Sequence, residues 1–196
     1  MKQATKTDAS WEKTLVCVGS NVTSIWGDPE ATVKMAVRVV SDRFRAPIEV
    51  SRFYKTPAFP ADSGDDFVNA AFAFQTQLSA HEILLILHEV EAEAMRRRES
   101  RWAARTLDLD LIAVADQVVP DPQVWQNWAG LPLEEQQRQA PDQLILPHPR
   151  VQDRAFALVP LCDVAPDWRH PVLDQTLEEL RDALPASDLE SVVPLN

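Results

Sequence analysis

The spacing of hydrophobic residues changes several times along the chain, and each change predicts a new structural element. Alternating or β-branched runs predict strands, whereas apolar residues that recur every three or four positions predict helices. The runs expected to form the main strands are residues 14–18, 48–56, 67–78 and 106–114. One helix is expected after Asp28 and Pro29, which are typical of an N-cap and a first helical position. A second helix is expected after the capping box of Ser79 and Glu82.

The second half of the chain has a less regular pattern. Further short strands are expected over residues 118–119, 144–146 and 155–161. An amphipathic helix is expected over residues 173–184, where leucines recur at helical spacing. Residues 120–143 are rich in proline and glutamine and carry Trp125 and Trp128, and we interpret this long connection as an insertion.

The order strand, helix, strand, strand, helix, strand predicts an α+β protein. It is typical of the ferredoxin-like split βαβ plan, in which helices cover a largely antiparallel sheet. A chain of 196 residues is long enough for one good core, so a single domain is expected over residues 13–185. Residues 1–12 and 186–196 are then expected to be flexible tails.

The composition narrows the classes of function. The chain has 30 acidic and 19 basic residues, and its net charge of −11 argues against a nucleic-acid partner. Its four glycines form neither a dinucleotide-binding fingerprint nor a Walker A loop. Cys17 and Cys162 are too few for a disulfide framework. No run of roughly 18 apolar residues or signal-peptide core occurs. We therefore expect a cytoplasmic protein without a membrane partner, and a monomer.

The strongest chemical signal is the pair Asp108 and Asp110. In a strand these two residues share a face, while Leu107, Leu109 and Leu111 point to the other side. Neighbouring carboxylates repel unless a cation lies between them, and oxygen ligands without nearby His or Cys suit Mg²⁺ bound to substrate phosphates. An isolated pair is more often a solvent-facing strand edge with alternating charges.

Five arginines immediately before this pair favour a metal and phosphate site over a simple solvent-facing strand edge. They are Arg96, Arg97, Arg98, Arg101 and Arg105. A polyphosphate requires metal for its bridging oxygens and guanidinium groups for the charge of the transferred group. The alternative is a solvated helix face on which these arginines pair with Glu89, Glu91 and Glu93.

Two weaker groups of residues lie elsewhere. His148, Arg150 and Arg154 are placed around two prolines and can bind phosphate, although a plain turn is the better explanation when they are considered alone. Phe67 and Asn69 share a strand face and offer a stacking ring beside an amide. Ordinary strand packing is the alternative for this pair.

Together, these features resemble the 6-hydroxymethyl-7,8-dihydropterin pyrophosphokinase family over residues 14 to about 170. The motifs are Val18-Gly19-Ser20-Asn21, Phe53-Tyr54-Lys55-Thr56-Pro57, Asp66-Phe67-Val68-Asn69-Ala70, Arg101-Trp102-x-x-Arg105-Thr106-Leu107-Asp108-Leu109-Asp110, Pro147-His148-Pro149-Arg150 and Arg154-Ala155-Phe156. The resemblance implies a three-layer α/β/α fold. It also implies transfer of a pyrophosphoryl group from ATP to the hydroxymethyl oxygen of the pterin, with release of AMP, in folate biosynthesis.

The resemblance also implies roles for individual residues. Two Mg²⁺ ions would be held by Asp108 and Asp110. The catalytic loop would contain Arg96, Arg98, Trp102 and Arg105. The residues implied to contact ATP are His88, Glu91, Leu111, His148 and Arg154. The residues implied to bind the pterin are Thr56, Ala58, Phe59, Phe67, Asn69 and Phe156, with the two rings of Phe67 and Phe156 on opposite faces of the ligand.

The chain departs from the family pattern in the arginine segment. It has Met95 where the family has glycine, and Ala103 and Ala104 where the family has Gly-Pro. A degenerate paralogue that binds nucleotide or pterin with little turnover is therefore the alternative. The intact acidic pair favours the enzyme, because a binding module has little need for paired metal ligands. An RNA-binding ferredoxin-like domain is disfavoured by the acidic charge and by the absence of ribonucleoprotein motifs.

Overall fold

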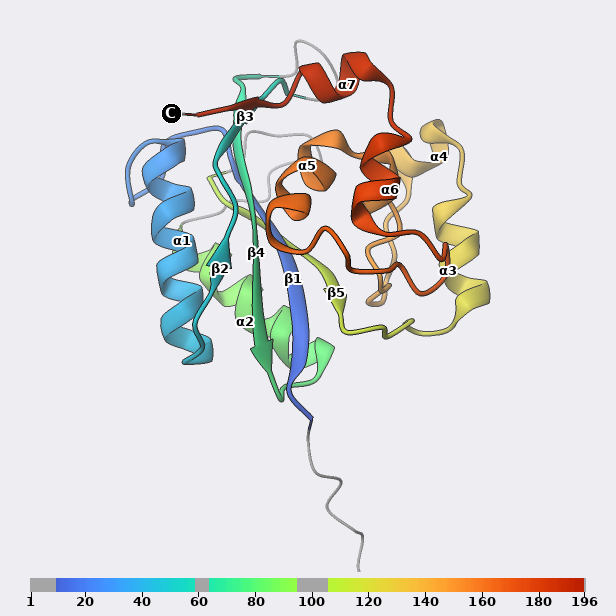
Figure 1. Cartoon of the computed structure of the whole chain (residues 1–196). Helices are drawn as coiled ribbons and strands as arrows, with labels where there is room; N and C mark the ends of the chain where they lie inside the picture. The colour runs from blue at the N-terminus through green and yellow to red at the C-terminus, as the bar shows by residue number, and fades with distance from the viewer. Residues whose placement is uncertain (1–9, 59–63, 95–105, 196) are drawn as a thin grey trace, which may run out of the picture.

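The computed structural model describes residues 10–58, 64–94 and 106–195, and its centre is an antiparallel sheet (Figure 1). The strands are β1 (Glu12–Ser20), β2 (Glu49–Val50), β3 (Tyr54–Thr56), β4 (Phe67–Thr76), β5 (Asp108–Val114) and β6 (Val193–Pro194). Their order is β5-β1-β4-β3-β6, and β2 also pairs with β4. The first four positions of this order reproduce the split βαβ plan, so the predicted fold class is confirmed.

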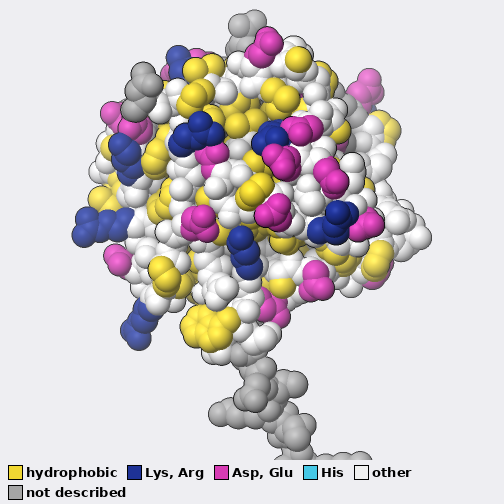
Figure 2. Space-filling model, in the orientation of Figure 1, with side chains coloured by type: hydrophobic (Ala, Val, Ile, Leu, Met, Phe, Trp, Pro, Cys, Tyr) yellow, Lys and Arg dark blue, Asp and Glu magenta, His cyan; other side chains and the backbone are white. Residues whose placement is uncertain are grey.

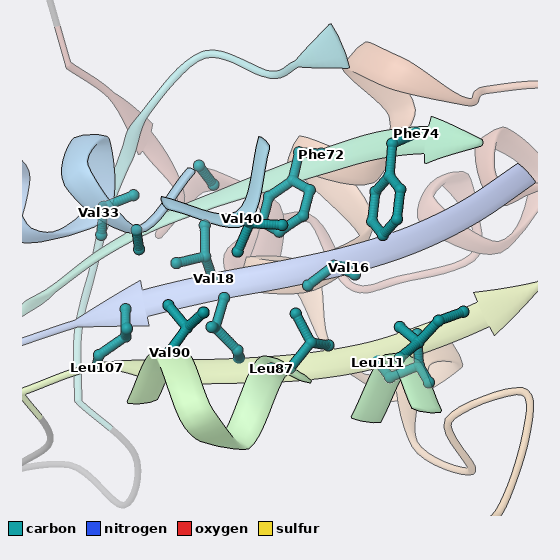
Figure 3. Close-up of a cluster of buried hydrophobic side chains, with 14 of the residues drawn as sticks. Val16, Val18, Val33, Val40, Phe72, Phe74, Leu87, Val90, Leu107 and Leu111 are labelled. Atoms are coloured by element: carbon teal, nitrogen blue, oxygen red, sulfur yellow. The ribbon is translucent and has the colours of Figure 1, made fainter. Parts of the chain in front are cut away.

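Helices cover both faces of the sheet, which gives the expected three layers (Figure 1). The helices are α1 (Pro29–Phe44), α2 (Ala80–Glu93), α3 (Pro122–Ala129), α4 (Leu133–Arg138), α5 (Ala155–Val164), α6 (Leu177–Asp182) and α7 (Ala186–Glu190), with a 3₁₀ turn η1 (Val151–Asp153). On one face, α1 and α2 enclose the buried cluster that Figure 3 shows, which includes Val16, Val18, Phe72 and Leu87. On the other face, α5 and α6 pack over a second cluster around Leu15.

The two predicted helix starts are confirmed by their caps. The Asp28 carboxylate accepts a hydrogen bond from the Ala31 backbone N–H at 2.9 Å, and Pro29 begins α1. At α2, the Glu82 carboxylate accepts from the Ser79 backbone N–H at 2.9 Å, and the Ser79 hydroxyl accepts from the Glu82 backbone N–H. These contacts satisfy backbone donors that have no partner within the helix.

The prediction of a strand over residues 155–161 is wrong, because these residues form α5. Short apolar runs do not distinguish a buried strand from a helix buried on most sides. Pro160 lies inside α5 and is itself buried, although proline is unusual within a helix. The consequence for the site is large, because α5 carries Phe156 over the sheet.

Other expected strands and one helix are shorter than predicted. The run 48–56 is divided into β2 and β3, and Ser51 between them accepts a hydrogen bond at 2.9 Å from the Ala71 backbone N–H. The short strands expected over residues 118–119 and 144–146 are reduced to one isolated bridge, in which Val119 pairs with Leu146. The helix expected over 173–184 begins only at Leu177, after a turn.

Three boundaries also differ from expectation. The insertion 120–143 contains α3 and α4 and is anchored by Trp125, which is 2% exposed. Residues 186–194, expected to be part of a C-terminal tail, form α7 and β6, and β6 pairs with β3. Glu12 already belongs to β1, while residues 1–9 lie outside the described residues. No helix in the described ranges has both the length and the hydrophobicity needed to cross a bilayer.

Candidate active site

The candidate site is built on one row of residues that crosses four adjacent strands. Tyr54 pairs with Asn69, Asn69 with Gly19, and Gly19 with Asp108. Antiparallel pairing thus brings the end of β1 beside the starts of β4 and β5. Because neighbouring strands lie about 4.8 Å apart, the backbones of Asn69 and Asp108 are separated by about 10 Å across Gly19.

The predicted orientation of the acidic pair is observed. Leu109 and Leu111 are buried in the cluster under α2, while Asp108 and Asp110 remain partly exposed on the opposite face. Their four carboxylate oxygens are the hard donors that Mg²⁺ prefers. The described residues contain no group of three His, Cys, Asp or Glu side chains placed to hold a metal. The pair therefore fits an ion that keeps water and substrate oxygens as its remaining ligands.

Cys17 lies beside this pair, because it is the strand partner of Asp110. Burial, followed by the negative charge of Asp110, raises the pKa of the Cys17 thiol well above its usual value. Metals bind cysteine as the thiolate, so the carboxylate oxygens are the better candidate metal donors on this face.

Arg154 connects the acidic pair to an aromatic ring. Its Nη1 lies 3.9 Å from Asp110 Oδ2, and its guanidinium carbon lies 5.5 Å from the centre of the Phe156 ring. Both charged side chains are about one-third exposed, so the ion pair is weak and leaves the guanidinium accessible to an anionic ligand. The structure therefore brings together Asp110, Arg154 and Phe156, as expected from the sequence.

His148 is fixed next to β5 by its backbone. Its N–H donates to the Ile112 carbonyl at 2.8 Å, and its Nδ1 accepts from the Arg150 backbone N–H at 3.2 Å. Burial, reinforced by the charges of Arg154 and Arg150, lowers the pKa of His148 to about 3. The ring is therefore neutral near pH 7, with the proton on Nε2 because Nδ1 is an acceptor. Its Nε2–H is thus a candidate donor for an anionic ligand.

At the other end of the row, Asn69 and Thr56 form a buried polar pair. The Asn69 Nδ2 donates to Thr56 Oγ1 at 2.7 Å, and the two residues are 8% and 4% exposed. Phe67 shares their face of the sheet, because it is the strand partner of Thr56. This end of the row therefore presents a carboxamide, a hydroxyl and a ring. Ala58, which follows β3, is also buried.

Three of the predicted nucleotide contacts are not brought to this face. Leu111 is 4% exposed within the cluster under α2, so its side chain points away from the site. Glu91 is 3% exposed, and its Oε1 accepts from the Leu109 backbone N–H at 2.9 Å, which ties α2 to β5. His88 is exposed on α2. Predicted site residues that lie outside the described residues are Phe59, Arg96, Arg98, Trp102 and Arg105.

The structure also shows supporting contacts that sequence reasoning missed. The Ser20 hydroxyl donates to the Thr106 carbonyl at 2.7 Å and so holds the start of β5 against the end of β1. Asp163 on α5 accepts from the Tyr54 hydroxyl at 2.7 Å and from the Arg52 guanidinium at 2.8 Å. Ser20 lies in a recognised motif, whereas nothing in the sequence singles out Asp163.

Comparison with known proteins gives the family. Residues 15–166 match the family described as 7,8-dihydro-6-hydroxymethylpterin-pyrophosphokinase. The chain belongs to this family. A protein of Methylorubrum extorquens named 2-amino-4-hydroxy-6-hydroxymethyldihydropteridine pyrophosphokinase is 34% identical over 139 residues, which are 71% of this chain and 74% of the relative. A Pseudomonas aeruginosa protein of the same name is 32% identical over 180 residues, covering 91% of this chain and 96% of the relative.

Solved structures of Plasmodium falciparum HPPK-DHPS show the same fold. The wild type with STZ-DHP has a TM-score of 0.62 at 11% identity over 90% of this chain, and the wild type has a TM-score of 0.60 at 13% identity over 88%. The chain covers 44% of each of those longer proteins. The resemblance, the pyrophosphokinase class and the assignment to folate biosynthesis are therefore confirmed for this chain.

Proposed function

We propose that this pyrophosphokinase binds the reduced hydroxymethylpterin at the Asn69 end of the cross-strand row and the ATP phosphates at the Asp108 end. The observation that carries this assignment is the row itself, which separates a buried carboxamide from a carboxylate pair by about 10 Å, or two strand spacings. Substrates bound at the two ends would then lie within reach of one another.

At the pterin end, Phe67 and Phe156 lie on β4 and α5 and hold the flat heterocycle by stacking. Asn69 and Thr56 supply hydrogen bonds to its edge, and the backbones of Ala58 and Phe59 complete the contacts. A ring with the wrong pattern of donors and acceptors would leave these buried groups unpaired, which is a strong basis for discrimination.

At the phosphate end, Asp108 and Asp110 would hold two Mg²⁺ ions. Such ions would supply charge neutralisation for the phosphate oxygens. Arg154 faces the same region with a full positive charge, and His148 donates from Nε2. We also propose that Arg96, Arg98, Trp102 and Arg105 act on the transferred group, and that His88, Glu91 and Leu111 contribute to nucleotide binding from the α2 side of β5.

The reaction that follows is a single displacement. The hydroxymethyl oxygen forms a bond to the β-phosphorus of ATP, the bond between that phosphorus and the oxygen on the α-phosphorus breaks, and AMP leaves. The hydroxyl proton passes to water as the new bond forms, and the former bridging oxygen leaves as part of the AMP phosphate. Positioning of two substrates by rigid strands converts this bimolecular step into an effectively unimolecular one.

Incubation with ATP, Mg²⁺ and 6-hydroxymethyl-7,8-dihydropterin tests the proposal. We expect AMP and the pterin diphosphate in equal amounts, and no product in EDTA. Stoichiometric ADP would contradict pyrophosphoryl transfer. Tight binding of both ligands without AMP would instead support the degenerate paralogue, so a binding measurement accompanies the assay.

We also propose that the enzyme acts as a monomer in the cytoplasm. Both cysteines are free, which fits a reducing compartment. The three most exposed large hydrophobic residues, Trp11, Ile25 and Leu85, lie in separate places, namely before β1, in the turn before α1, and on α2. In Figure 2, acidic and basic side chains are interspersed over the face that α5 and α6 cover. Size-exclusion chromatography with light scattering tests the monomer.

A further inference from the structure

Gly19 occupies the centre of the cross-strand row, where any side chain would collide with Asn69. A Cβ atom built on Gly19 would lie 2.4 Å from Asn69 Oδ1 and 3.6 Å from Asn69 Cγ. Real Cβ atoms essentially never approach a heavy atom closer than 3.0 Å, so even alanine requires a shift of the amide. The same Cβ would be in ordinary contact with the Phe67 ring, at 3.7 Å from Cδ1.

Asn69 has little freedom to move away from such a contact. It is 8% exposed, and its Nδ2 donates to Thr56 Oγ1 at 2.7 Å, which holds the amide from the opposite side. Thr56 is itself buried in the short strand β3. A displaced amide would therefore lose a buried hydrogen bond as well as its position.

The backbone conformation alone does not require glycine at position 19. Gly27 and Gly64 have positive φ values of 117° and 152°, which side chains rarely adopt, whereas Gly19 lies in regular β1 pairing with both β4 and β5. Glycine in a strand interior weakens the strand and often marks a place where another group must approach closely. Here that group is the carboxamide of Asn69.

We propose that Gly19 is a positioning residue for pterin specificity: the missing side chain lets the Asn69 amide lie across β1 and present its edge to the ligand. With one amide hydrogen donated to Thr56, Asn69 keeps one N–H and one oxygen side by side. That pair matches a cyclic amide edge, in which a ring N–H lies beside a carbonyl. The inference rests on the proposed contact between Asn69 and the pterin.

A double-mutant cycle with Gly19→Ala and Asn69→Ala tests the inference. The readouts are the Kd for 6-hydroxymethylpterin, the Kd for a non-hydrolysable ATP analogue with Mg²⁺, and the Tm. We expect Gly19→Ala to weaken pterin binding at least tenfold and to leave ATP-analogue affinity within about twofold. In the Asn69→Ala background the same change should weaken pterin binding by less than twofold, because the atom it displaces is gone.

The Tm values provide a second criterion, because a general folding defect would not predict that adding a second substitution raises the Tm. The double variant should be more stable than Gly19→Ala alone, since removing the amide relieves the collision. Gly130→Ala, at the end of α3, is a matched glycine control that should change neither Kd. Equal loss of pterin affinity from Gly19→Ala in both backgrounds would overturn the inference. So would unchanged affinity in Gly19→Ala. If Asn69→Ala alone leaves pterin binding intact, the proposed pterin site itself is wrong.

Discussion

Lowering the pH from 7 to 5 should destabilise the fold through His170, which lies far from the acidic pair in sequence. Its side chain is fully buried between Trp125 and Trp168, whose ring centres lie 4.9 and 5.6 Å from the imidazole centre. Its Nδ1 accepts from the Val172 and Leu173 backbone N–H groups, each at 3.2 Å. Protonation of Nδ1 would break both bonds inside an apolar environment.

The size of the effect follows from the pKa of His170, which burial lowers from 6.5 to about 4. Between these values the unfolded chain binds a proton that the folded chain does not, so stability falls as the pH is lowered. Integrating from pH 7 to pH 5 gives a loss of about 2 kcal/mol in the free energy of unfolding from this residue alone. Above pH 7 the residue contributes almost no pH dependence.

Urea unfolding of His170→Asn at several pH values isolates this contribution. Asparagine keeps an acceptor for backbone N–H groups two and three positions ahead but does not titrate in this range. The variant should be less stable at pH 7, because it loses both ring contacts, yet its stability should fall about 2 kcal/mol less between pH 7 and 5 than that of the wild type. His81→Asn, on the exposed first turn of α2, is the control and should keep the wild-type slope. Parallel curves for wild type and His170→Asn would refute the reasoning.

Three further changes probe the site. Asp110→Asn removes a proposed metal ligand, and we expect kcat to fall on the order of 10³-fold while chemical unfolding shows no loss of stability, because carboxylate repulsion is relieved. Phe67→Ala should weaken pterin binding by about 1 kcal/mol or more by fluorescence titration, with ATP-analogue binding unchanged. Trp125→Phe removes the indole N–H that donates to the Pro147 carbonyl at 2.8 Å. It should cost about 1–3 kcal/mol of stability and raise the Kd for the ATP analogue, because Pro147 precedes His148.

The elements that could be predicted well from the sequence are the strands and helices with a clear periodicity of hydrophobic residues. Alternation along β4 and β5 separated the leucines under α2 from Asp108 and Asp110, and the caps located α1 and α2 correctly. The sequence failed at α5, where an almost uniformly apolar run has no period to distinguish helix from strand. Since α5 places Phe156 over the sheet, its misassignment hid the geometry of the candidate site, although the sequence had singled out the residue itself.

Contacts between residues far apart in the sequence could not be predicted either. Gly19 stood in a recognised motif, but its collision with the Asn69 amide requires knowledge of strand register. Glu91 and Leu111 were chosen by resemblance, and only the packing of α2 on β5 shows that one is tied to the backbone and the other buried. Such properties depend on which elements pack against each other. The local pattern of hydrophobic residues does not contain this information.

The hydrogen bonds that Arg52 and Tyr54 donate to Asp163 also bear on the order in which parts of the chain fold during synthesis. Asp163 lies 111 residues after Arg52, and β3 gains its outer neighbour only from Val193 and Pro194. On the ribosome, α1 and the β1–β4 pair emerge early, but β3 remains an unprotected edge until nearly the whole chain has been synthesised. The end of the cross-strand row that contains Thr56 is therefore completed last. A chain stalled after β5 would carry the carboxylate pair without the Asp163 contacts and the outer strand that stabilise the proposed pterin side.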